Sequence, residues 1–140
     1  MNTRQTRNAE ARRLGQRGEE AAARHMTRHG LRILARNWRQ GQLELDMVCA
    51  EGDTLVFVEV KTRQAAGLAA PADALTPRKR AALRRAAQAW LNAHDAWQHP
   101  CRFDVVSVLC QDQTLTLEHY PHAFDFSSPV GGGNAAWQPW

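Results

Sequence analysis

Two strand-like segments, Leu43–Ala50 and Thr54–Thr62, flank a short turn, and they limit how this chain can fold more than any other feature does. Apolar residues recur at every second position in both segments, which is the period of a β-strand. The turn contains Gly52 and Asp53, and Gly at the first place of a two-residue loop is typical of a type II′ turn. The sequence therefore predicts a β-hairpin built on this loop.

The two-residue loop also sets which side chains face each other across the hairpin. In the predicted register, Asp46 lies opposite Glu59 and Glu44 lies opposite Lys61. Opposed residues share one face, with Cβ atoms roughly 4.5–5.5 Å apart, whereas a change of one residue in the loop would move Asp46 and Glu59 to opposite faces. The face that carries these charges also carries Phe57. Four charged side chains are therefore expected close together on one face of the sheet.

Both faces of the hairpin are apolar near the turn, which predicts a sheet covered on both sides. Asp46 and Glu59 would then meet at the rim of a core, where two unpaired carboxylates are costly. A divalent cation between them would remove this cost, because hard oxygen ligands suit Mg²⁺. An ion pair between Glu44 and Lys61, with Asp46 and Glu59 at a wet edge, accounts for the same pattern without a metal. The spacing alone leaves both interpretations open.

Asp46, followed after twelve residues by Glu59-Val60-Lys61, resembles the D-x(n)-E-x-K signature of the PD-(D/E)XK nucleases. A longer ordered series resembles one branch of them, the YraN-type bacterial family related to archaeal Holliday-junction resolvases. Its pieces are GEEA at 18–21, RNWR at 36–39, ELDMV at 44–48, VFVEVKTR at 56–63, PADA at 71–74, TPRK at 76–79, RFDVV at 102–106 and AF at 123–124. One departure is Leu43, which stands where the family has Gly before the Glu of its G-E-I-D-L motif.

The patterns beside the hairpin predict two helices and three further strands. These elements are a helix from about Ala9 to His29, a strand Leu31–Arg39, a helix starting at Thr76 and Pro77, and strands Arg102–Cys110 and Thr114–His119. The order αβββαββ indicates an α/β protein with a mixed sheet of about five strands flanked by helices. It agrees with the restriction-endonuclease-like core that the resemblance implies. Residues 1–8 are expected to be a disordered basic arm, 9–126 the nuclease-like domain, and 127–140 a disordered tail.

The resemblance implies a metal-dependent endonuclease acting on DNA, with branched DNA as a specific candidate substrate. Asp46, Glu59 and the Val60 carbonyl would hold Mg²⁺ or Mn²⁺. Lys61 would polarise the attacking water or neutralise charge in the transition state. A Glu of the first helix completes the metal site in the related resolvases, which makes Glu19 a candidate, and Glu44 would support the site or add a ligand. The candidate catalytic residues are therefore Asp46, Glu59, Lys61, Glu19 and Glu44.

The net charge of +4 is unevenly distributed. Residues 1–40 and 77–100 hold fifteen of the eighteen Lys and Arg but only four of the fourteen Asp and Glu. Basic helices beside an acidic sheet suit a polyanionic partner, although arginine-rich helix surfaces often serve only for solvation. Lys79 lies within the apolar arc of its helix, so it must snorkel or point into the site. The candidate contacts to nucleic acid are Arg63, Arg78, Lys79, Arg84 and Arg85.

Three cysteines form no C-x-x-C pair and are interpreted as small buried hydrophobic residues in a reducing compartment. No apolar run approaches the roughly 20 residues of a membrane span, and the N-terminus has no apolar signal core. The expectation is a cytoplasmic protein without a membrane partner.

Several alternatives remain open. Asp104 is expected to pair with an arginine or to cap a turn and not to join the site. The pairs His25/His29 and His119/His122 have metal-like spacing but no further ligand nearby. A non-catalytic nucleic-acid-binding or DNA-repair accessory protein that retains a nuclease fold is the second functional hypothesis, and an RNA-directed binder is the third. The related resolvases dimerise to cut two strands symmetrically, so the resemblance also implies a homodimer.

Overall fold

The computed structural model describes residues 3–65 and 75–127. In chain order its elements are α1 (Thr3–Arg28), β1 (Arg32–Gln40), β2 (Leu43–Glu51), β3 (Thr54–Gln64), α2 (Pro77–His94), β4 (Cys101–Gln111) and β5 (Thr114–Phe124). The predicted order αβββαββ is confirmed. Most of the predicted loop 64–75 and nearly all of the predicted tail 127–140 lie outside the described residues. Neither described helix is long and apolar enough to cross a membrane.

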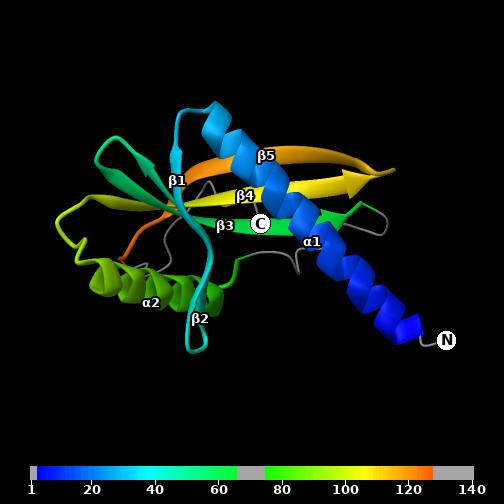
Figure 1. The fold of residues 1–140 in the computed structure, drawn as a ribbon, viewed down its shortest axis with the longest axis horizontal. Helices are drawn as coiled ribbons and strands as arrows, with labels where there is room; N and C mark the ends of the chain where they lie inside the picture. Colours follow the sequence, from blue (N-terminus) through cyan, green and yellow to red (C-terminus); the bar gives the residue numbers. More distant parts are fainter. Residues whose placement is uncertain (1–2, 66–74, 128–140) are drawn as a thin grey trace.

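The five strands form one mixed sheet in the order β1-β2-β3-β4-β5. β3 and β4 run parallel and are connected through α2, whereas the other neighbouring strands are antiparallel. The two helices cover opposite faces of this sheet (Figure 1). On β3, Val56 and Val58 pack beneath α1, and Leu55 and Phe57 pack beneath α2. The predicted coverage of both faces is therefore confirmed.

The predicted hairpin register is confirmed from Glu51↔Thr54 as far as Met47↔Val58. The single alternation predicted along the whole of β2 is wrong, because Leu45 packs in the core under α2 while Met47 packs in the core under α1. The change of face occurs at Asp46. It coincides with an irregularity in β1: Asn37, between the paired residues Arg36 and Trp38, adopts a left-handed φ of 52°.

Helix α1 begins at Thr3, six residues earlier than predicted, so residues 3–8 are helical and do not form a disordered arm. The first half of the helix extends past the sheet (Figure 1). The buried positions begin only at Gly18 and continue through Ala22 and Ala23 to Met26. The buried residues of α1 therefore all lie in its second half.

Helix α2 begins as predicted, with Pro77 in its first turn and Thr76 as its N-cap. The Thr76 side chain accepts a hydrogen bond from the backbone N–H of Lys79 at 3.1 Å. This cap satisfies a backbone donor that has no partner within the helix. Its apolar face is buried and consists of Leu83, Ala86, Ala87, Trp90 and Leu91.

Strand β5 continues to Phe124 and does not end at His119 as predicted. Pro121 does not stop it, because β5 is an edge strand and the missing N–H of a proline there need not cost a ladder bond. The sheet register shifts nearby, between Phe103 and Val105, and His122 adopts a φ of 54°. This irregularity brings the end of β5 beside Asp104.

Candidate active site

Asp46 lies where β2 separates from β3. Backbone pairing between the two strands ends at Met47↔Val58, and β2 then turns away toward α2 (Figure 1). The backbone N–H of Val60 has no backbone partner on β2. It donates instead to the side-chain carboxylate of Asp46 at 2.8 Å. The change of face at Asp46 therefore places its side chain against the backbone of β3, next to Glu59.

Glu59 is nearly buried, with 8% of its surface exposed. Burial and the neighbouring Asp46 charge raise the pKa of Glu59 to about 8, although Lys79 and Lys61 act in the opposite direction. The Lys79 ammonium lies 3.7 Å from the Glu59 carboxylate. Of the two positions predicted for Lys79, the structure therefore has the one that points into the site. Glu59 is the acid in this group that gains most from a nearby positive charge.

Helix α1 brings Glu19 close to Asp46. The helix can approach β3 closely because the residue next to Glu19 is Gly18. A Cβ on Gly18 would overlap the Thr62 side chain, so a larger residue would push the helix off β3. Burial raises the pKa of Glu19, and the Asp46 charge raises it further. Asn37 hydrogen-bonds to Glu19. The structure therefore brings the predicted Glu19 and Asp46 together.

The predicted pairing of Glu44 with Lys61 is replaced by another contact. Glu44 is exposed and forms an ion pair with Arg39 at 3.1 Å. Its charge still contributes to raising the pKa of Glu19, so it lies at the edge of the acidic group. Lys61 is half-buried on β3, and its charge acts on Glu59. The wet-edge interpretation does not hold for Glu59, which is buried.

The donor set at this place fits Mg²⁺ or Mn²⁺. Asp46 and Glu59 supply carboxylate oxygens and Val60 supplies a backbone carbonyl. Proteins usually hold Mg²⁺ by one or two carboxylates, with water and substrate phosphate as the other ligands. Across residues 3–65 and 75–127, no three His, Cys, Asp or Glu side chains form a metal-binding group by themselves. Two carboxylates beside a carbonyl are what this site offers.

The basic residues predicted to contact nucleic acid differ in their surroundings. Arg78 and Arg85 are exposed on α2. Arg84 donates to the backbone carbonyls of Asp125 at 2.8 Å and Ser127 at 3.1 Å, and it lies over the Phe124 ring. Arg84 therefore holds the end of the described chain against α2. Arg63 is half-buried near the end of β3.

Sequence reasoning missed Asn37 and Arg36, the two β1 residues closest to the acidic group. Arg36 pairs with Glu20 at 2.9 Å and lowers the pKa of Glu19. The sequence did contain a signal for them, because both residues belong to the family-like motif RNWR at 36–39. Asn is also among the few residues that adopt a left-handed φ readily.

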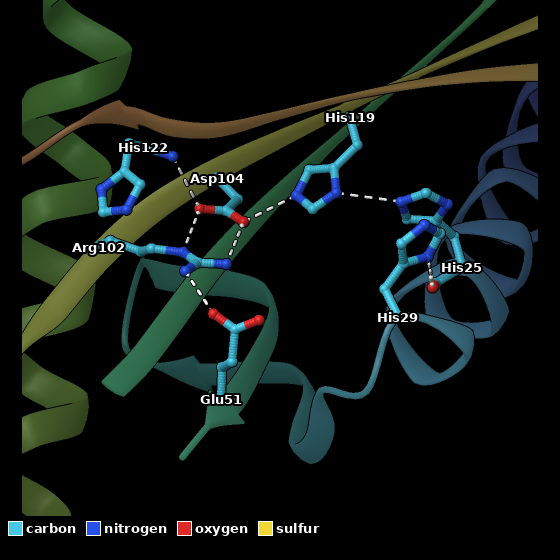
Figure 2. Close-up of polar contacts among 7 residues, drawn as sticks. All are labelled: His25, His29, Glu51, Arg102, Asp104, His119 and His122. Carbon is cyan, nitrogen blue, oxygen red and sulfur yellow. Dashed lines mark hydrogen bonds and ion pairs between the residues drawn. The ribbon is translucent and has the colours of Figure 1, made fainter. Parts of the chain in front are cut away.

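A second polar group lies on the α1 side of the sheet and surrounds Asp104 (Figure 2). Asp104 is completely buried and accepts hydrogen bonds from Arg102 at 3.0 Å, from His119 at 2.8 Å and from the backbone N–H of His122 at 3.1 Å. Arg102 also donates to Glu51 at 2.7 Å. The prediction that Asp104 pairs with an arginine is confirmed.

This group extends to α1 through two imidazoles (Figure 2). The Asp104 carboxylate can only accept, so His119 donates to it through Nε2, and Nδ1 of His119 shares a hydrogen bond with Nε2 of His25, 3.0 Å away. His29 donates through Nδ1 to the His25 carbonyl at 2.8 Å. The two histidine pairs noted in the sequence therefore contribute to one hydrogen-bonded chain that ties α1 to β4 and β5.

Comparisons with known proteins agree with the resemblance seen in the motifs. The sequence profile of the uncharacterised protein family UPF0102 matches residues 18–108, a range that includes Glu19, Asp46, Glu59 and Lys61. A UPF0102 protein of Nitratidesulfovibrio vulgaris (strain DP4) is 59% identical over 126 residues, which cover 90% of this chain and 94% of that relative. A UPF0102 protein of Lawsonia intracellularis is 46% identical over 127 residues, or 91% of this chain and 96% of the relative. By family profile and by these relatives, the chain belongs to UPF0102, the YraN-type bacterial family.

Proposed function

We propose that this chain is a Mg²⁺- or Mn²⁺-dependent endonuclease acting on DNA, with branched DNA as a specific candidate substrate. The observation that supports it most is the meeting of Asp46 with the buried Glu59 at the point where β2 leaves β3. Two carboxylates held together in this way are unfavourable unless a proton or a cation lies between them. A metal site would explain why the fold holds two carboxylates in this unfavourable arrangement.

In the proposed site, Asp46, Glu59 and the Val60 carbonyl hold the metal. The metal would supply the activation of water and the stabilisation of charge on the phosphate. Lys61 follows Glu59 by two residues on the same strand, so its ammonium is placed for the attacking water or a phosphate oxygen. Glu19 lies beside Asp46 and would position it or add a ligand.

Lys79 has a second part in this proposal. It lies 3.7 Å from Glu59 and offsets that charge when no metal is present. Once a metal neutralises Glu59, the Lys79 ammonium can turn to a phosphate oxygen of the substrate. The basic helices position the DNA through its backbone, which carries no sequence information.

Incubation of the purified protein with labelled linear, flapped, four-way and single-stranded DNAs, with Mg²⁺ or Mn²⁺, tests the proposal. We expect metal-dependent cleavage of at least one of these DNAs, and no cleavage with a chelator. Glu19→Gln should reduce it, whereas Glu10→Gln is a matched control, because Glu10 is exposed on the first half of the same helix.

DNA binding without cleavage of any substrate by any divalent metal would contradict the endonuclease proposal. That result would favour the alternative, a non-catalytic nucleic-acid-binding or repair accessory protein. Competition by A-form duplex RNA separates an RNA-directed binder from both. Symmetric cutting of a four-way DNA would require two copies of the chain, and light scattering with and without DNA tests that homodimer.

A further inference from the structure

A groove runs between the outer surface of α1 and the start of β5. It is lined by Arg13, Gln16, Arg17, Glu20 and Arg24 of α1 and by Leu115 of β5. The three arginines are spaced by four and seven residues, so they project from one face of the helix. None of them was among the predicted contacts to nucleic acid.

The positive charge of this groove is not neutralised within the described chain. Its one acid, Glu20, is paired with Arg36 at 2.9 Å. Arg17 donates to the backbone and side-chain oxygens of Gln113 at 3.0 Å and 3.3 Å, which are uncharged acceptors. Among residues 3–65 and 75–127, neither Arg13 nor Arg24 has a carboxylate within ion-pair distance. Three guanidinium charges are therefore available to a ligand.

The length of the groove suits a chain of phosphates better than one small anion. Arg13 and Arg24 are eleven residues apart, or roughly 16 Å along the helix axis. That distance corresponds to roughly five phosphates of one strand at 3.4 Å each along a duplex. The arginines are too widely spaced to surround a single phosphate, but one strand running along α1 can contact all three.

The groove also adjoins the candidate active site. Gln16 and Glu20 line a second groove on the β1 side of α1, together with Glu19, Arg36 and Asn37. A bound strand can therefore pass from Glu19 over the exposed side of α1 into the arginine groove. On α2, by contrast, the Arg84 side chain already donates hydrogen bonds to the backbone carbonyls of Asp125 and Ser127.

We infer that the groove between α1 and β5 binds the phosphate backbone of nucleic acid that extends from the active site. This inference rests on the proposed function for the identity of the ligand. It assigns the main electrostatic contact to Arg13, Arg17 and Arg24 of α1, and not to the basic residues of α2.

The test measures binding of a labelled DNA duplex by fluorescence anisotropy at several salt concentrations, with a chelator so that no cleavage occurs. The variant is Arg13→Gln with Arg24→Gln, because neither side chain forms a hydrogen bond or ion pair with another described residue that its loss would break. The matched control is Arg7→Gln with Arg12→Gln, which removes the same charge from exposed positions of α1 that do not line the groove. Circular dichroism confirms that both variants are folded.

Each lost phosphate contact reduces the slope of log K against log salt by about 0.9. We expect the groove variant to lose about 1.8 and the control less than half of that. Equal losses in the two variants would overturn the inference, because only net charge would then matter. No loss in the groove variant, or no DNA binding by the wild-type protein, would overturn it as well. Failure of the proposed function is a separate result, because it is an absence of cleavage with metal.

Discussion

Two buried carboxylates on neighbouring strands of this protein have opposite surroundings. Glu59 on β3 and Asp104 on β4 differ by one step along the parallel ladder, in which Val58 pairs with Asp104 and Glu59 with Val105. Burial raises the pKa of Glu59 to about 8, and Asp46 adds to that effect. Burial also acts to raise the pKa of Asp104, but hydrogen bonds from His119, Arg102 and the His122 N–H outweigh it and lower that pKa.

The difference separates a structural acid from a candidate functional one. Asp104 has donors from its own strand and from β5, and so it stabilises the fold as it stands. Glu59 faces another acid across the point where β2 leaves β3, and the nearest ammonium of Lys79 is 3.7 Å away. Asp104 already has its hydrogen-bond partners in place, whereas Glu59 is the acid to which we assign a cation in the proposed site.

The largest expected effect is on cleavage. Asp46→Asn removes one of two opposed anions and should reduce metal-dependent cleavage by more than about a hundredfold, because it removes a principal metal ligand. Its fold should survive, and without metal its stability should equal or exceed that of the wild type. Cleavage rates and urea unfolding of the two proteins measure both quantities. Equal cleavage rates of wild type and Asp46→Asn would show that Asp46 has no part in catalysis.

Asp104→Asn should have the converse effect. It leaves Arg102 and His119 facing a neutral side chain in a site without solvent, and breaking such a buried pair typically costs about 3 kcal/mol or more. The free energy of unfolding, measured with urea, should fall by that amount in Asp104→Asn but not in Asp46→Asn. A loss of similar size in both variants would show that the two acids have the same structural role.

The close approach of α1 to β3 should be sensitive to one methyl group. Gly18→Ala places a Cβ against Thr62, and overpacking of this kind costs about 1–3 kcal/mol. Gly15→Ala, in the same helix, has nothing within 4 Å and should instead stabilise by up to about 1 kcal/mol. Thermal unfolding of both variants measures the contrast. Gly18→Ala should also weaken metal binding, since it displaces Glu19.

A further effect, spread over several pH units, is expected on the pH dependence of stability without metal. The pKa of Glu59 is raised from 4.5 to about 8, so the folded protein holds this proton more tightly than the unfolded chain does. Stability should therefore fall as pH rises from about 5 to about 8, by at most about 1.4 kcal/mol per pH unit. Glu59→Gln lacks this contribution, so the difference between wild type and variant at each pH isolates it.

The Asp104 and His25 shifts differ from that of Glu59 in sign or pH window, whereas the raised pKa of Glu19 acts with the same sign. The lowered pKa of Asp104 confines its loss of stability to acid conditions, below the usual 3.8. Burial lowers the pKa of His25 from 6.5, so the stability linked to His25 rises with pH over the lower part of the same range. A difference between wild type and Glu59→Gln that stays constant with pH would contradict the assignment to Glu59.

Features determined by short-range patterns could be predicted from the sequence. The Gly52 and Asp53 loop was enough for the hairpin register from Glu51↔Thr54 to Met47↔Val58, and Thr76 with Pro77 was enough for the start of α2. The predicted ladder pair of Asp46 with Glu59 lies beyond that range, and the two acids meet through the change of face at Asp46. Glu19 was predicted from family resemblance alone, and its position depends on the contact between Gly18 and Thr62.

Features that depend on another part of the chain could not be predicted. The change of face at Asp46 coincides with the left-handed backbone of Asn37 on a different strand. The His122 N–H reaches Asp104, eighteen residues away, because β5 continues through Pro121 as an edge strand. The Arg84 side chain is held by carbonyls of Asp125 and Ser127, which no local pattern indicates.

Calorimetric titration of Mn²⁺ into the metal-free protein tests most directly whether Asp46 and Glu59 form a metal site. The wild-type protein should bind Mn²⁺ at neutral pH and release protons as it does, because Glu59 must ionise to become a ligand. Asp46→Asn and Glu59→Gln should each lose this binding, and Glu10→Gln should retain it. Wild-type protein that binds no Mn²⁺, or binding that survives in both Asp46→Asn and Glu59→Gln, would contradict the proposed site.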